Sequence, residues 1–309
     1  MTRRAALDAD LGEVFSVRDA LLADVSAQRL RASDLDAPFH GGRMLKQTPP
    51  PAATVFEQEH SELTRLARAF LAVAPQQFAF SHVTAARLYR IPLPRHCETD
   101  PRLHVTVPPA AQPPRRPGVV GHRGALTDVR YLDGVPALAP ARVWAQLATV
   151  LSVDELVVAG DFLVRRKRPL CEMGELLDAL VPRMRGIAVG RAAARGIRPL
   201  TDSPAESRTR LVLVREGLPE PIIRYTVHDA DGYFVGTPDL AYIAERVAIE
   251  YEGDEHRTNR DVFEDDIIRR ELFERAGWKV ILVTDRRLRN PGAVVAEVRV
   301  ALTERAVLR

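Results

Sequence analysis

The sequence predicts a protein of mixed α and β structure (α+β) with more than one domain. Its 309 residues are 46% apolar, which is enough for more than one packed core. Apolar residues recur at helical spacing in many segments, whereas in other segments they alternate as in strands. Proline-rich stretches at 48–53 and 108–117 separate some of these segments. We expect three domains, at 1–50, 51–195 and 196–309.

The composition excludes several classes of protein. The chain has 44 basic and 41 acidic residues, a net charge of +3 that permits nucleic-acid binding without requiring it. Cys97 and Cys171 are the only cysteines, so a disulfide framework and a zinc site built on cysteine are excluded. The N-terminus lacks the apolar core of a signal peptide, and every apolar run ends well before about 18 residues. We therefore expect a cytoplasmic protein without membrane contact.

The pattern of the first 50 residues predicts two short helices and a hairpin. The first helix spans 14–24 with Ser16 as N-cap, the second spans 26–35, and a tight hairpin follows at 38–44. This is the outline of a winged helix, which places its second helix in the major groove of DNA. A plain helical hairpin is the alternative. In the winged-helix interpretation, the candidate nucleic-acid contacts are Arg29, Arg31 and Arg43.

Residues 51–195 predict a small α+β domain. Its expected helices cover 57–72, 81–88, 139–149, 152–163, 173–180 and 186–195, and its expected strands cover 103–107 and 119–123. The basic run at 165–168 fits either a solvated helix end or a set of phosphate contacts.

The pattern of residues 196–309 predicts a helix, antiparallel strands, a second helix, a further strand and a final helix. The expected elements are a helix at 203–217, a strand at 222–228 with a turn at 229–232, two strands that carry Asp239 and Glu250, a helix at 260–276, a strand at 278–284 and a helix to about 305. Ser203, Pro204 and Glu206 form a capping-box pattern at the start of the first helix, which by itself would explain Glu206.

Asp239 and Glu250 are expected to face each other. A tight turn at Ala244 and Glu245 pairs residue 243 with 246, which sets residue 239 opposite 250 on adjacent antiparallel strands. Opposite side chains have Cβ atoms about 5 Å apart, and alternation adds Glu252 to the same face. That face is predicted to be an acidic patch with alanines at its base, and it comprises Asp239, Ala241, Ala248, Glu250 and Glu252. The other face is predicted to pack in the core and comprises Leu240, Tyr242, Val247, Ile249 and Tyr251.

Carboxylates this close resist joint ionisation unless a positive charge lies between them. Mg²⁺ or Mn²⁺ is the simplest such charge, because these ions prefer oxygen ligands and are commonly held by one or two carboxylates. An exposed acidic face neutralised by lysine or arginine is the alternative. The sequence therefore predicts Asp239 and Glu250 as metal ligands.

The C-terminal third also resembles a known group of enzymes. The residues that carry the likeness are, in chain order, Glu206, Asp239 after a proline, Glu250-Tyr251-Glu252-Gly253, His256, Asp266, Arg269 and Gly277-Trp278. This order resembles the PD-(D/E)xK nuclease superfamily, and more closely the domain of unknown function 559 family, relatives of the very-short-patch-repair (Vsr) endonucleases. The first two thirds are similar, less specifically, to AbiEi-type regulator and antitoxin proteins through Gly134-Val135-Pro136 and the segment 140–144.

The resemblance implies a role for each residue of the motif. Besides the two metal ligands, Glu206 would be a supporting acid acting through water, and His256 a general base or phosphate contact, although a turn residue is the alternative. Asp266 and Arg269 would orient the site. Glu252 stands where the superfamily usually has lysine, which puts the lysine's role in doubt.

The resemblance implies a function as well. The expected protein is a metal-dependent endonuclease of DNA, delivered by the N-terminal module. A catalytically inactive DNA-binding regulator or antitoxin-like protein is the alternative, RNA is not excluded as the substrate, and a homodimer is left open.

Overall fold

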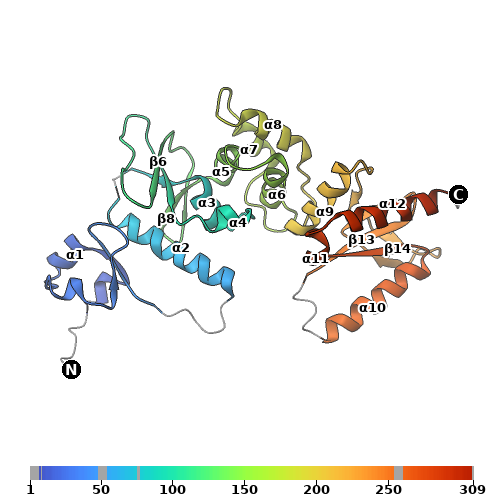
Figure 1. The fold of residues 1–309 in the computed structure, drawn as a ribbon, viewed down its shortest axis with the longest axis horizontal. Helices are drawn as coiled ribbons and strands as arrows, with labels where there is room; N and C mark the ends of the chain where they lie inside the picture. The colour runs from blue at the N-terminus through green and yellow to red at the C-terminus, as the bar shows by residue number, and fades with distance from the viewer. Residues whose placement is uncertain (1–6, 8, 48–53, 75–76, 254–259, 308–309) are drawn as a thin grey trace. The chain divides into compact units, whose positions relative to one another are not determined.

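The computed structural model describes residues 7, 9–47, 54–74, 77–253 and 260–307, and only the backbone of residues 260–267. The chain divides into two compact units, Met1–Leu147 and Ala148–Arg309 (Figure 1). Both combine helices and strands, so the predicted α+β class is confirmed. The predicted divisions at residues 50 and 195 fall inside these units, and the three-domain division stays a prediction.

The start of the first unit is a small three-stranded sheet with order β1-β3-β2 and antiparallel pairing. Its elements are η1 Ala9–Leu11, β1 Val14–Ser16, α1 Val17–Leu22, η2 Arg29–Arg31, β2 Leu35–Asp36 and β3 Gly42–Leu45. Ser16 caps α1 as predicted, because its Oγ accepts a hydrogen bond from the backbone N–H of Asp19 at 3.0 Å. The predicted hairpin is confirmed as β2 and β3.

The second helix expected at 26–35 is wrong. Only a single 3-10 turn, η2, forms there. Arg29 donates two hydrogen bonds to the Asp34 carboxylate, at 3.0 and 2.8 Å, and the chain turns at this point into β2. The described part of this module therefore has no second helix of the length that the winged-helix prediction needs.

The rest of the first unit contains a five-stranded mixed sheet with order β6-β5-β4-β8-β7. Its elements are α2 Val55–Leu71, β4 Ala79–Phe80, α3 His82–Leu88, α4 Arg95–Glu98, β5 Leu103–Val107, β6 Val119–Arg123, β7 Val129–Leu132, β8 Val135–Leu138 and α5 Pro140–Leu147. The predicted strands at 103–107 and 119–123 are confirmed and are parallel neighbours. The hairpin of β7 and β8 was not predicted.

The second unit begins with three helices, α6 Val153–Leu163, α7 Met173–Asp178 and α8 Ile187–Gly196, followed by α9 Pro204–Arg215. A buried ion pair joins α9 to α6: Arg210 Nη2 lies 2.9 Å from Asp161 Oδ2, and the two side chains are 2% and 0% exposed. Arg210 also donates to the Gly196 carbonyl and to Glu220 Oε1, each at 2.9 Å. This network fixes α9 against the helices that precede it.

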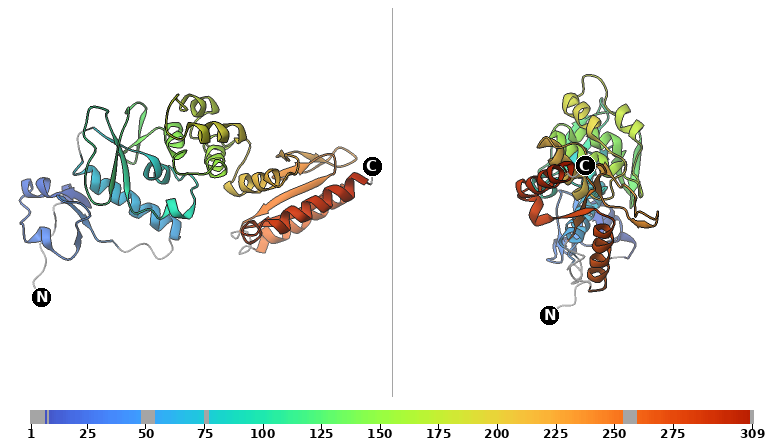
Figure 2. Two further views of the ribbon diagram at one scale, coloured as in Figure 1. Left: turned by 45° about the horizontal axis from the view of Figure 1, so that its top comes forward. Right: turned by 90° about the vertical axis from the view of Figure 1, so that its right-hand side faces the viewer.

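A four-stranded mixed sheet with order β14-β13-β12-β9 forms the centre of the second unit. Its strands, the hairpin β10–β11 and the later helices are β9 Ile222–Ile223, β10 Val227–His228, β11 Phe234–Gly236, β12 Leu240–Tyr242, β13 Val247–Glu252, α10 Arg260–Arg275, β14 Lys279–Thr284, α11 Asp285–Leu288 and α12 Gly292–Val307. Strands β13 and β14 are parallel, whereas β12 pairs antiparallel with both β13 and β9. Helices α10 and α12 lie on opposite sides of this sheet (Figure 1), and α12 runs alongside its strands (Figure 2).

The predicted register of β12 and β13 is confirmed. Leu240 pairs with Ile249 and Tyr242 pairs with Val247, which is the ladder that places residue 239 opposite 250. The predicted core face is confirmed too, because it packs against apolar residues of α9, α12 and β14. Sequence alternation and the tight turn were sufficient to fix this part of the fold.

The prediction for the opposite face was partly wrong. Ala241 and Ala248 do not floor an open patch, because both are fully buried in a second core. Phe273 of α10, Trp278 and the hairpin β10–β11 cover them. The acids therefore lie at the end of a covered face.

No helix among the described residues is both long and apolar enough to cross a membrane.

Candidate acidic site of the second unit

Three acidic residues lie in or next to α9, β12 and β13. Glu206 lies in the first turn of α9, Asp239 directly precedes β12, and Glu250 lies within β13. The confirmed ladder places Asp239 and Glu250 at opposing positions on one face of the sheet. The opposition of Asp239 and Glu250 is the arrangement that the sequence predicted, whereas Glu206 was expected from the family resemblance.

Glu206 is the most deeply buried of the three acids, with 5% of its surface exposed. Ser203 caps the helix by accepting a hydrogen bond from the Glu206 N–H at 3.2 Å. The Glu206 carboxylate accepts the N–H of Asp202 at 3.0 Å, one residue before the position that a capping box uses. Burial, and then the nearby Asp239 carboxylate, raise the pKa of Glu206 to about 7.

Asp239 is fixed by the neighbouring strand. Its Oδ2 accepts a hydrogen bond from the backbone N–H of Tyr251 at 2.8 Å, and its carbonyl oxygen accepts the N–H of Arg224 at 3.0 Å. Burial raises the pKa of Asp239, while the Tyr251 hydrogen bond and the positive charges of Arg269 and Arg224 oppose the increase. The carboxylate is thus oriented and carries a charge that burial disfavours.

Glu250 lies beside an arginine of α10. Arg269 Nη2 is 2.6 Å from Glu250 Oε1 and also donates to the Thr237 carbonyl at 3.0 Å. Gly236 of β11 lies against Phe273 of α10. Glycine is required at this position, because a Cβ atom there would lie 2.9 Å from the Phe273 ring. Arg269 therefore connects α10 to the strand that leads into Asp239, in keeping with the orienting role that the sequence predicted. Arginine therefore neutralises part of the acidic patch through Arg269 and Glu250, which is the alternative to a metal ion given above.

More cations surround a fourth acid, Asp202, which directly precedes the N-cap of α9. The guanidinium groups of Arg224 and Arg166 lie 2.7 and 2.9 Å from Asp202 Oδ2, and the Lys167 ammonium lies 3.9 Å away. Arg166 and Lys167 belong to the basic run 165–168. The structure therefore places part of that run next to the residue that binds Glu206 through its backbone N–H.

The remaining predicted site residues fall into two groups. Glu252 ends β13 and is partly exposed. His256 lies outside the described residues, and Asp266 lies in the part of α10 whose side chains are not described. Their predicted roles stay predictions.

The predicted nucleic-acid contacts of the first unit are only partly accessible. The Arg29 side chain is 9% exposed and is held by Asp34. Arg43 donates to the carbonyl oxygens of Leu30 and Gly42, at 2.8 and 2.7 Å. Both arginines therefore stabilise the small module in this conformation, whereas Arg31 is exposed.

The described residues contain one group of three metal-binding side chains whose ligand atoms all lie within 4.8 Å of one another, and it is not acidic. It consists of His82, His104 and His122 in the first unit. Sequence reasoning missed this cluster. Its one signal was the prediction of the two strands, at 103–107 and 119–123, that carry His104 and His122.

We expect Glu206→Gln to change how stability depends on pH. Because the fold raises the pKa of Glu206 from 4.5 to about 7, its stabilising contribution is complete below the unfolded value and is lost as the pH rises through about 7. Without metal, the variant should therefore gain about 2 to 3 kcal/mol over wild type between about pH 5 and pH 8. Urea denaturation in EDTA measures this difference, with Glu216→Gln, an exposed position at the end of α9, as the control. Parallel pH profiles for all three proteins would contradict the prediction.

Comparison with known proteins identifies relatives without a described function. No protein-family model matches the chain. Two uncharacterized proteins of Mycobacterium tuberculosis, MT2308 of strain CDC 1551 / Oshkosh and Rv2248 of strain ATCC 25618 / H37Rv, are each 29% identical over 220 residues. The match covers 70% of this chain and 78% of each relative. Among solved structures, the crystal structure of the RV2827C protein from Mycobacterium tuberculosis aligns with a TM-score of 0.40 and 19% identity, over 70% of this chain and 80% of that chain.

Proposed function

We propose that the second unit is a metal-dependent endonuclease that hydrolyses phosphodiester bonds in DNA, and that it belongs to the PD-(D/E)xK superfamily near the domain of unknown function 559 branch. The observation that carries this proposal is the pair of opposing acids Asp239 and Glu250 at one end of a mixed sheet, with Glu206 close enough for the Asp239 charge to raise its pKa. The second unit also has the predicted order of a helix, antiparallel strands, a helix, a strand and a helix.

The acidic residues fit a hard divalent cation. Asp239 and Glu250 supply oxygen ligands on one face, and Mg²⁺ usually takes one or two protein carboxylates together with water and phosphate oxygens. Burial raises the pKa values of Asp239 and Glu206, because little water is present to stabilise their negative charge. A bound cation would relieve this cost. When bound, Mg²⁺ or Mn²⁺ polarises a phosphate and lowers the pKa of its water.

Each residue of the chain has a distinct task in this proposal. Asp239, fixed by the Tyr251 N–H, and Glu250 hold the cation. Arg269 is partly exposed and paired with Glu250, so it can exchange this carboxylate for a phosphate oxygen when the cation takes its place. Arg166 and Lys167 are 40% and 70% exposed and offer further positive charge to a phosphate backbone. Glu206 supports the two metal ligands: its carboxylate accepts hydrogen bonds and orders a water molecule.

Incubation of the full chain with supercoiled plasmid tests the proposal. We expect nicking with Mg²⁺ or Mn²⁺ and none with EDTA. A structured RNA of equal nucleotide concentration, added as a competitor, separates the two substrates. If the plasmid stays intact with either metal while the protein binds DNA in a salt-dependent manner, the inactive DNA-binding regulator becomes the better description.

A further inference from the structure

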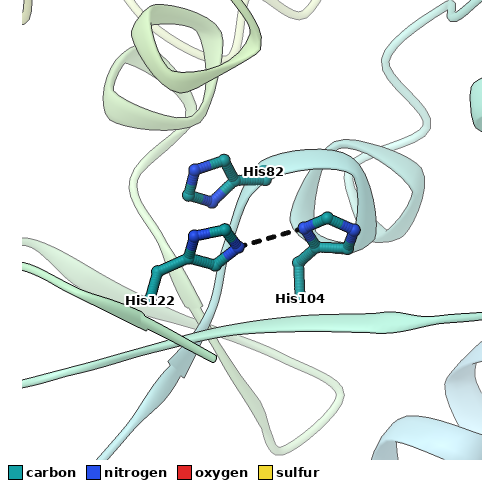
Figure 3. Close-up of side chains that lie close together, drawn as sticks. All are labelled: His82, His104 and His122. Carbon is teal, nitrogen blue, oxygen red and sulfur yellow. Dashed lines mark hydrogen bonds between the residues drawn. The ribbon is translucent and has the colours of Figure 1, made fainter. Parts of the chain in front are cut away.

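Three histidines of the first unit converge from three elements (Figure 3). His82 begins α3, His104 lies in β5 and His122 lies in β6. The parallel register pairs His104 with Val120 and Thr106 with His122, so the two strand histidines are diagonal neighbours on one face. His104 Nδ1 lies 3.1 Å from His122 Nε2, and the rings of His82 and His122 stack at 3.8 Å between centroids.

The backbone of His82 adopts an uncommon conformation that keeps its ring over the sheet. Its φ angle is 49°, in the left-handed region, which costs a residue with a Cβ atom free energy. Two hydrogen bonds hold this turn: the N–H of Ser81 donates to the His104 carbonyl and the N–H of His82 donates to Gln146 Oε1, each at 3.0 Å. The surrounding fold thus positions this imidazole against its neighbours.

The three rings are neutral at neutral pH. Burial, and then the neighbouring histidines, lower the pKa of His82 to about 3, and burial followed by His104 lowers the pKa of His122 to about 4. Burial also lowers the pKa of His104, although Asp100 opposes the shift.

A carboxylate stands behind one of the histidines. Asp100 Oδ2 lies 3.6 Å from His104 Nε2, and Arg102 fixes Asp100 with two hydrogen bonds of 2.9 and 2.8 Å. The carboxylate lies on the Nε2 side of His104, so Nδ1 is the ring nitrogen that faces His122. The distance of 3.1 Å between His104 Nδ1 and His122 Nε2 is close to the roughly 3.3 Å that two ligands of one tetrahedral zinc would have.

We propose that His82, His104 and His122 bind one Zn²⁺ ion, with the fourth position left to water or another small ligand. Three imidazoles without a carboxylate suit zinc and its transition-metal neighbours and do not suit Mg²⁺. Because the stacked ring of His82 presents its face to His122, binding turns this ring until a nitrogen points at the ion. The bound ion would crosslink α3, β5 and β6.

Metal titration of the full chain tests this site. After EDTA treatment and dialysis into excess Mg²⁺, which fills the acidic site of the second unit, isothermal titration calorimetry should detect one Zn²⁺ equivalent for wild type. Zn²⁺ should also raise the midpoint of thermal unfolding. His122→Gln should weaken Zn²⁺ affinity by at least about 100-fold. His122 is partly exposed on an edge strand, so this variant should keep its fold, which circular dichroism checks. His96→Ala, at an exposed position of α4, is the matched control and should bind as wild type.

Co²⁺ gives a second readout that needs no variant, because a tetrahedral site shows visible absorption bands. The proposal is overturned if wild type binds no Zn²⁺, or if it binds Zn²⁺ with the same stoichiometry and affinity as His122→Gln. Loss of binding in His96→Ala to the same extent would place the ion elsewhere and would equally overturn it. None of these readouts depends on nuclease activity.

Discussion

Asp239→Asn is expected to reduce metal-dependent nicking of plasmid by about 100- to 1,000-fold. Loss of one anionic ligand weakens the cation that polarises the phosphate, a contribution of several kcal/mol, and each 1.4 kcal/mol changes the rate tenfold. The asparagine Oδ1 can still accept the Tyr251 N–H, so the strand pairing should remain. The rate of conversion of supercoiled to open-circular plasmid measures the effect.

The same variant should be at least as stable as wild type in EDTA. Burial disfavours the Asp239 charge, and removal of that charge also removes its repulsion of Glu206. Asp231→Asn, in the exposed turn between β10 and β11, is the matched control and should leave both nicking and stability unchanged. Nicking by Asp239→Asn at the wild-type rate would refute the assignment of this residue as a metal ligand.

Arg210→Met is expected to lower the free energy of unfolding by about 3 to 5 kcal/mol. It leaves the Asp161 carboxylate, which is 0% exposed, without the cation that opposes its burial. Burial already raises the pKa of Asp161, and without Arg210 this effect should grow. Chemical denaturation monitored by circular dichroism provides the free energy.

Helices α6 and α9 supply a matched control for this prediction. The ion pair of Arg215 and Asp154 joins the same two helices, but its side chains are 65% and 34% exposed. Arg215→Met should therefore cost no more than about 1 kcal/mol. A double variant that replaces Arg210 by Met and Asp161 by Leu should recover much of the loss, because an apolar pair leaves no buried charge. Equal costs for Arg210→Met and Arg215→Met would contradict this account.

The local patterns of the sequence predicted much of the second unit. The register of β12 and β13 followed from a tight turn and from alternating side chains, and Glu206 was placed by its helix cap. Such signals lie within a few residues, so one sequence is enough to detect them. The element order of the described part of residues 203–307 agrees with the prediction, except that the expected strand at 222–228 is split and that β11 and α11 were not predicted.

Longer-range contacts could not be predicted in the same way. The position of Phe273 over Ala241 and Ala248 depends on how α10 packs, which no local pattern specifies. The apolar spacing of residues 26–35 predicted a helix, whereas the ion pair of Arg29 with Asp34 holds a turn there, a contact that spacing alone does not specify. His82 and His104 are 22 positions apart, and their meeting depends on a left-handed turn at the start of α3.

Glu206 and Arg210 lie one helical turn apart on α9, so one rigid element holds both a site acid and the buried cation that anchors it. A fragment that starts near residue 196 would keep every predicted ligand but would lose Asp161 and the helix α6 that carries it, so Glu220 would be the one carboxylate partner left to Arg210. Dissection of the chain should therefore cut near residue 147, with the three preceding helices retained as the foundation on which the acids are positioned.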